Sequence, residues 1–107
     1  MKNKLKNYKK YCAYAIFVLS FPTEIFAQLD SIYYDSGELK AFGELQNNAK
    51  HGHWKYFYPN GEINAIEKYQ DGKLNGEIIN YYPNGQISSE ENWVHGELEG
   101  WSVYFFE

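Results

Sequence analysis

The side chains best suited to chemistry in this sequence are three histidines, two of which, His51 and His53, are two positions apart. Residues spaced in this way face the same side of a β-strand, and paired histidines can bind a metal ion. The third histidine, His95, lies far along the chain. An internal repeat of the sequence aligns His51 and His95 with asparagine, aspartate or glutamate. We therefore interpret the histidines as polar turn residues and expect no metal site.

Acid–base and nucleophilic chemistry lack the arrangement of residues that they need. Glu90 and Glu91 are adjacent, so their carboxylates would face opposite sides of a strand and could not act as a pair. The serines have no histidine beside them in the repeat, which disfavours a serine hydrolase. The glycines separate strands and do not lead into a helix, as a phosphate-binding loop requires. We expect a non-enzymatic protein with no catalytic residues and no cofactor.

The N-terminal segment has the composition of an export signal. Five lysines and no acidic residue lie between Met1 and Lys10, and an apolar run follows from Tyr11 to Phe21. A membrane-spanning helix needs about 20 apolar residues, so we expect no stable membrane insertion. Ala27 supplies a small residue for cleavage. We predict a signal peptide over residues 1–27 and an exported protein that is periplasmic, surface-bound or secreted.

The remaining segment, residues 28–107, is acidic and free of cysteine. Cys12 is the only cysteine and lies in the predicted signal peptide, so the processed chain could form no disulfide. The segment carries 5 lysines, no arginine and 13 acidic residues, a formal charge of −8. Phosphate backbones repel a chain of this charge, so we expect no binding to nucleic acid.

A 24-residue repeat organises this segment. In each unit two aromatic residues lead into a turn that is closed by glycine, and the equivalent ranges are 33–39, 57–63 and 81–87. A fourth unit begins at Phe105. Because the repeat length is even, equivalent side chains fall on one face of a growing sheet. The pairs Asn60–Gly61 and Asn84–Gly85 tolerate positive φ and are typical of hairpin tips.

A second set of turns lies between those tips. Asn48 takes the place that Gly72 and Gly96 fill in later units, and asparagine is the non-glycine residue that best tolerates the left-handed conformation. These turns extend to a second series of glycines with the spacing of the repeat: Gly52, Gly76 and Gly100. We predict an all-β domain without helices, with strands near residues 31–34, 38–46, 53–58, 62–70, 77–82, 86–94 and 101–106.

The strands after the tips alternate apolar and polar residues, which predicts one packed face. The small residues Ala41, Ala65 and Ser89 recur at one position and leave room for an aromatic ring from an adjacent strand. A single unit is too small to fold alone, so we expect three repeats and a partial one to stabilise each other as one domain.

The strands before the tips carry aromatic residues on both faces. We expect one set to be buried and the other to lie on the outer face, where it could bind a partner. The alternative is that these rings form cross-strand ladders that only stabilise the sheet. The candidate partner-binding aromatics are Trp54, Tyr56, Tyr58, Tyr82 and Tyr104.

The pattern from Tyr69 to Gly76, followed by Tyr81-Tyr82-Pro83-Asn84-Gly85, resembles the MORN repeat in its bacterial variant with a Tyr-Tyr-x-x-Gly turn. The resemblance covers residues 33–106. It implies a single-layer open sheet of successive β-hairpins. It also implies a scaffold for protein partners or contact with phospholipid, and some relatives of this variant carry an antitoxin label. No catalytic residue belongs to the motif.

Together these observations predict an exported, non-catalytic repeat module that interacts with an unknown protein or with a cell-envelope component. The aromatic strand near residues 101–106 has no following partner strand, and such an edge favours self-association. Two alternatives remain open. One is a cytosolic, antitoxin-like protein binder, and the other is an envelope protein that binds or degrades glycans.

Overall fold

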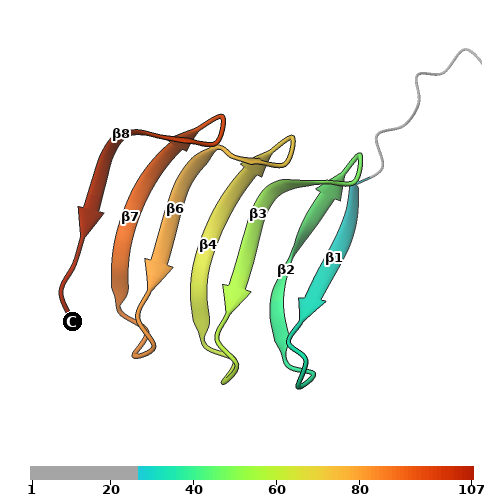
Figure 1. The fold of residues 1–107 in the computed structure, drawn as a ribbon, viewed down its shortest axis with the longest axis horizontal. Coiled ribbons are helices and arrows are strands. Elements are labelled where there is room, and N and C mark those ends of the chain that lie inside the picture. The colour runs from blue at the N-terminus through green and yellow to red at the C-terminus, as the bar shows by residue number, and fades with distance from the viewer. Residues whose placement is uncertain (1–26) are drawn as a thin grey trace, which may run out of the picture.

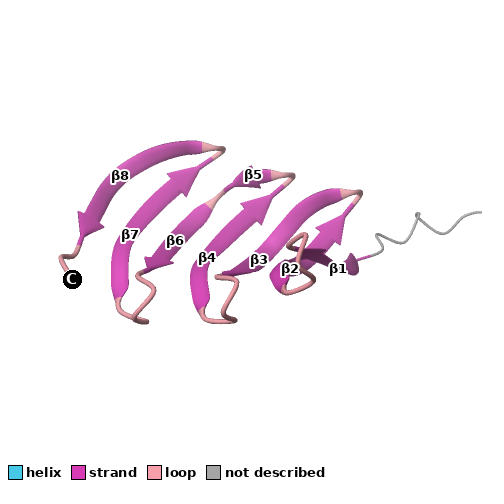
Figure 2. Ribbon diagram, turned by 60° about the horizontal axis from the view of Figure 1, so that its bottom comes forward, coloured by secondary structure: helices cyan, strands magenta, loops and turns pink. Residues whose placement is uncertain are grey.

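Residues 27–107 are described by the structure, a computed structural model. Their strands follow one another in chain order and form a single curved layer, as Figures 1 and 2 show. Within residues 27–107 there is no helix, and hence none that could cross a membrane. The prediction of an open, all-β meander of hairpins is confirmed. The strands are β1 (Ala27–Tyr33), β2 (Leu39–Gln46), β3 (Ala49–Phe57), β4 (Ile63–Gln70), β5 (Lys73–Leu74), β6 (Gly76–Tyr81), β7 (Ile87–Val94) and β8 (Glu97–Tyr104).

Every pair of neighbouring strands is antiparallel. The order across the sheet is β1-β2-β3-β4-β6-β7-β8, and the short β5 pairs with the end of β4. Strand β4 pairs directly with β6 through Ala65 opposite Asn80 and Ile66 opposite Ile79. Adjacent repeats are therefore joined by backbone pairing as well as by side chains.

The three hairpin tips share one turn. In the middle tip the Gly61 N–H donates to the Tyr58 carbonyl at 2.9 Å, and the Tyr58 N–H donates to the Glu62 carbonyl at 2.7 Å. Gly61 has a φ of 89°, whereas Asn60 is not among the residues with positive φ. The Asn60 side-chain oxygen instead accepts the Glu62 N–H at 3.0 Å. Glycine alone therefore meets the left-handed requirement that the sequence analysis had assigned to the Asn-Gly pair.

The opposite turns consist of two residues, both with positive φ, as in type I′ hairpins. Asn47 and Asn48 have φ values of 51° and 61°, so the prediction that Asn48 replaces a left-handed glycine is confirmed. The later turns have the same form: 50° and 78° at Asp71–Gly72, and 50° and 83° at His95–Gly96.

The strands after these turns begin earlier than predicted. We expected starts near residues 53, 77 and 101, but β3 begins at Ala49, β5 at Lys73 and β8 at Glu97. The prediction was wrong because Gly52 and Gly100 do not end a turn. They lie inside strands with φ values of 67° and 82°, where the pairing register shifts. A glycine at positive φ is typical of a bulge that bends a strand.

The first strand is also longer than predicted. It extends over Ala27–Tyr33, and Ala27 pairs with Gln46. The predicted signal peptide lies outside the described residues except for Ala27.

One face of the sheet holds the core. Ala41, Ala65 and Ser89 are at most 5% exposed. Tyr56 lies opposite both Ala41 and Ala65 in the register. The prediction that small residues leave room for an aromatic ring is confirmed, because a small residue flanks Tyr56 on each side.

Candidate interaction surface

Trp54 is the largest fully buried side chain of the described residues. Its ring lies over Gly43, where an added Cβ would meet ring carbons at 2.5 to 2.6 Å. The indole Nε1 donates to the Glu44 carbonyl at 2.9 Å. The ring thus fills the space that a side chain at position 43 would take. Trp54 was predicted to be a candidate partner-binding residue, but its ring is fully buried and inaccessible to a partner.

Three rings surround the ammonium group of Lys50. Its Nζ lies 4.8 Å from the ring centroid of Trp54, 5.1 Å from that of Tyr56 and 5.0 Å from that of Tyr69. Each distance is within the range of a cation–π interaction. We call these four residues the Lys50 cage. They come from β3 and β4, so the cage joins the two strands of one hairpin.

A chain of hydroxyl groups runs through the Lys50 cage. Lys50 Nζ donates to the Tyr56 hydroxyl at 2.6 Å, and the Tyr56 and Tyr69 hydroxyls are 3.1 Å apart. Tyr69 in turn donates to the Glu67 carboxylate. Burial raises the pKa of Tyr69, and the hydrogen bond to Glu67 raises this pKa further. The two phenol groups therefore connect the ammonium group of Lys50 with the carboxylate of Glu67, and the Tyr56 hydroxyl is already hydrogen-bonded within the sheet.

The next repeat keeps part of this arrangement. The Trp93 Nε1 donates to the Glu91 carboxylate at 2.8 Å, as the Tyr69 hydroxyl does to Glu67. Leu74 occupies the position equivalent to Lys50, so the cation site is confined to one unit. This site was not predicted from the sequence. A charge at a position that is leucine in both later units, Leu74 and Leu98, was the signal that could have indicated it.

Tyr58 and Tyr82 belong to a ladder of tyrosines at the hairpin tips. The hydroxyls of Tyr34, Tyr58 and Tyr82 each donate to the carbonyl of the residue 23 positions later, at 2.6 to 2.7 Å. The acceptors are Phe57, Tyr81 and Phe105. We call this set the tyrosine ladder. It ties each tip to the next, which is the stabilising role that the sequence analysis left open for these rings.

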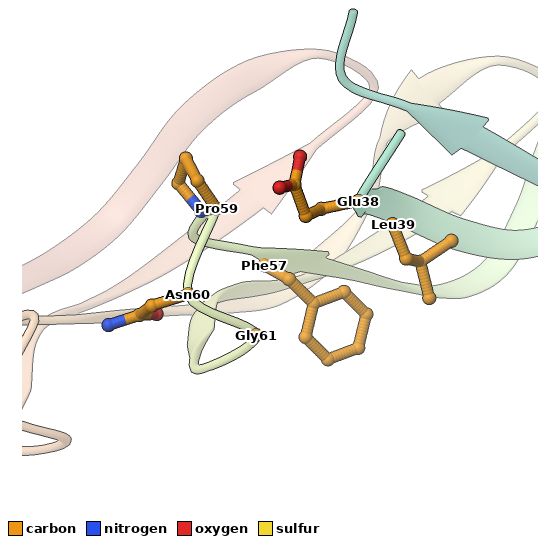
Figure 3. A pocket seen from close by; sticks show the side chains of 6 residues that line it. All are labelled: Glu38, Leu39, Phe57, Pro59, Asn60 and Gly61. Carbon is orange, nitrogen blue, oxygen red and sulfur yellow. The ribbon is translucent and has the colours of Figure 1, made fainter. Parts of the chain in front are cut away.

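A hollow of about 390 Å³ lies between the first two tips. Figure 3 shows the Leu39 side chain and the Phe57 ring beside each other on one side, with Glu38 and Pro59 on another. Ser36 donates to the Glu38 carboxylate, and this hydrogen bond lowers the pKa of Glu38. The hollow combines an apolar wall with one ionised carboxylate. It could accept a small side chain of a partner.

The last strand presents most of the exposed apolar surface. Of nine large apolar side chains that are exposed within residues 27–107, six lie in or just after β8. Tyr104 is 66% exposed, so it is the predicted aromatic that stays accessible, whereas Trp54 is buried. The other five are Leu98, Trp101, Val103, Phe105 and Phe106.

The histidines show no feature of a metal site. His95 lies in a two-residue turn with a φ of 50°, and the buried Nδ1 of His51 has no hydrogen-bond partner among the described residues. Within residues 27–107, no group of three or more histidine, cysteine or acidic side chains is placed to hold a metal ion.

This geometry defines a β-hairpin repeat protein in which each unit stacks on the next. The family model described as the MORN repeat variant matches residues 50–71 and 74–95. These two matches, which together cover less than half of the chain, support a MORN repeat protein, as its sequence indicated. The first matched repeat contains the whole Lys50 cage. MORN repeats are commonly non-catalytic interaction modules. No curated protein and no solved structure matches the chain.

Proposed function

We propose that this protein is an exported, non-catalytic interaction module that binds another protein or a cell-envelope component through β8. The observation that carries the proposal is the concentration of exposed apolar side chains on that strand. Trp101, Val103 and Tyr104 are 47%, 41% and 66% exposed. Large exposed apolar surface on a small domain is typical of interaction sites.

The other aromatic residues support this choice because their polar groups are already occupied. Tyr56 and Tyr69 hold Lys50, and Tyr58 and Tyr82 hold the neighbouring tips. Tyr104 has the position of Tyr56 in the repeat, but within residues 27–107 it has a flanking strand on one side only. Strand β8 thus offers both apolar side chains and a backbone edge to which an extended segment could pair.

Export is supported by the five lysines and the apolar run within the segment 1–27. The test is to fractionate cells that produce the 107-residue chain and to determine the N-terminus of the protein in each fraction. We expect a protein outside the cytoplasm that begins at Gln28. A cytosolic protein that retains Met1 would contradict export and would favour the antitoxin-like alternative.

Binding is tested by capture of the tagged chain from its native cells, with quantitative mass spectrometry of the retained material. One variant carries Trp101→Ser and Tyr104→Ser, and a matched control carries Leu29→Ser and Tyr33→Ser on the opposite edge. Loss of an anchoring aromatic residue costs about 2 kcal/mol or more, so we expect the first variant to lose the partner. Equal retention by both variants, each shown to be folded by circular dichroism, would contradict β8 as the binding strand.

A further inference from the structure

The pairing of β8 with β7 determines which backbone N–H and C=O groups of β8 point away from the sheet. Tyr104 lies opposite Ser89, Val103 opposite Glu90 and Ser102 opposite Glu91. The Phe105 N–H donates to the Ser88 carbonyl at 2.9 Å, so the odd-numbered residues direct their backbone groups toward β7. Ser102 and Tyr104 therefore direct their N–H and C=O groups away from the sheet. Within residues 27–107 no strand lies on that side.

On the core face, β8 also has fewer neighbours than the equivalent strand β3 has. Tyr56 lies between two small residues, Ala41 on β2 and Ala65 on β4. Tyr104 has the equivalent position, with Ser89 on its inner side and no described residue on its outer side. An added strand should therefore place a small residue next to Tyr104.

We propose that the strand added to β8 is the β8 of a second copy, paired antiparallel about a two-fold axis at Val103. This register places Ser102 of each copy opposite Tyr104 of the other. Tyr104 then lies between Ser89 and Ser102, as Tyr56 lies between its two alanines. The outward-facing N–H and C=O groups of Ser102 and Tyr104 are then all paired.

The opposite face of the strand agrees with the same register. Val103 lies against Val103 of the second copy, and Trp101 lies against Phe105. These three side chains are 41 to 47% exposed in the single chain, and the pairing would cover all of them. A two-fold axis perpendicular to the sheet keeps both core faces on one side, so the two arrays join as one sheet. One self-complementary surface is sufficient for such a closed dimer.

The proposed register brings acidic side chains together at its ends, where Glu99 faces Glu107 of the other copy. Like charges directly opposite each other on neighbouring strands are unfavourable, and salt screens this repulsion. The dimer should therefore dissociate more readily at low ionic strength. This salt dependence is opposite in sign to that of an interface held by ion pairs.

Disulfide trapping tests the register. At the two-fold axis Val103 forms a non-hydrogen-bonded pair, in which the Cα atoms are about 4.5 Å apart and a disulfide can form. In a Cys12→Ser background of the full chain, we expect Val103→Cys to form a disulfide-linked dimer upon mild oxidation. Phe105→Cys is the matched control because both residues are 41% exposed. Its own copy would lie four positions away along the strand, about 13 Å, which is too far for a disulfide.

Light scattering of the unmodified 107-residue chain supplies the second measurement, with twice 12.6 kDa as the expected mass. A monomeric mass at every concentration up to about the micromolar level typical of specific complexes, or equal cross-linking of both cysteine variants, would overturn the proposal. Ser102→Pro should yield a folded monomer, because the N–H that it removes points outward. The inference rests on β8 as the binding strand of the proposed function. A monomer that still captures a partner through Trp101 and Tyr104 would overturn self-pairing and leave the proposed function intact.

Discussion

Tyr58 donates its hydroxyl to the carbonyl oxygen of Tyr81 at 2.7 Å, across the boundary between two hairpin tips. The same bond recurs on both sides, from Tyr34 to Phe57 and from Tyr82 to Phe105. A side chain of one repeat thereby satisfies a backbone group of the next. In a single-layer sheet with few fully buried residues, such contacts between neighbours carry a large share of the stability.

Removing one hydroxyl from the tyrosine ladder should weaken the sheet by the value of one hydrogen bond. We expect Tyr58→Phe to lower the free energy of unfolding by about 0.5 to 1.5 kcal/mol, measured by urea denaturation. Tyr33→Phe is the control, because Tyr33 is 60% exposed and surface changes usually stay within about 0.5 kcal/mol. Similar midpoints for the two variants would argue against a stabilising ladder.

Adding one methyl group at Gly43 should disturb the core through Trp54. The Cβ of Gly43→Ala would lie 2.5 Å from the indole ring, so the ring has to move. We expect a loss of about 1 to 3 kcal/mol in the free energy of unfolding. Trp54→Ile introduces the residue found at the equivalent position of the next repeat, Ile78, and removes the indole ring that the added methyl group would meet.

A double-mutant cycle measures this relationship directly. If Trp54 is the reason why position 43 requires glycine, Gly43→Ala should cost much less in the Trp54→Ile background than in the original chain. Additive effects of the two changes would show that another feature excludes a side chain at position 43.

The Lys50 cage predicts a cost for removing its charge. Lys50→Leu gives the residue found at the equivalent position, Leu74, but withdraws the cation from three rings and the donor from the Tyr56 hydroxyl. We expect a loss of about 0.5 to 2 kcal/mol in the free energy of unfolding, measured by urea denaturation. Lys40→Leu is the control, since the exposed Lys40 lies over a single ring, Tyr34, at 5.5 Å. A neutral or stabilising effect of Lys50→Leu would mean that the cage acts only as apolar packing.

The raised pKa of Tyr69 predicts a dependence of stability on alkaline pH. Burial and the bond to Glu67 raise this pKa above its ordinary value of 10.0 in the folded chain. The unfolded chain therefore loses the proton first. The stabilising contribution is complete below about pH 10 and decreases as the pH rises above that value.

The measurement is the melting temperature from about pH 8 to about pH 11, compared with that of Tyr69→Phe. We expect the variant to lose less stability than the original chain over the alkaline part of this range. Parallel curves would show that the proton of Tyr69 does not contribute, and Tyr33→Phe reports the slope due to an exposed tyrosine.

The sequence was sufficient to predict the hairpin order, because the constant spacing of the repeat and the position shared by Asn48, Gly72 and Gly96 fix the turns. It was insufficient for Gly52 and Gly100, because a left-handed glycine has the same appearance in a sequence whether it closes a turn or bends a strand. Parity grouped Trp54 with Tyr56 correctly, since both lie on the core face. The alternation of residues along the strand could not show which of the two faces is buried. The burial of Trp54 depends on the space left by the missing side chain at Gly43.

The Lys50 cage could not be predicted from the repeat pattern, for a different reason. Lys50 precedes Gly52, which has positive φ, whereas Trp54 and Tyr56 follow this glycine and Tyr69 lies opposite it on β4, so the path of β3 at Gly52 determines whether the ammonium group meets the rings. Cross-strand neighbours of a bulged strand do not follow from simple alternation. The aromatic strand near residues 101–106, in contrast, was predicted from the sequence, and it lies within β8 at the edge of the sheet formed by residues 27–107.

Residue-resolved hydrogen exchange tests the central claim, that β8 is the binding strand, most directly. The chain would be compared at low concentration and in the assembly isolated from its native cells. We predict slowed exchange at the outward-facing amides of Ser102 and Tyr104, with little change at the tips. Protection at the tips around Tyr34 and Tyr58, with unchanged exchange along β8, would contradict the account.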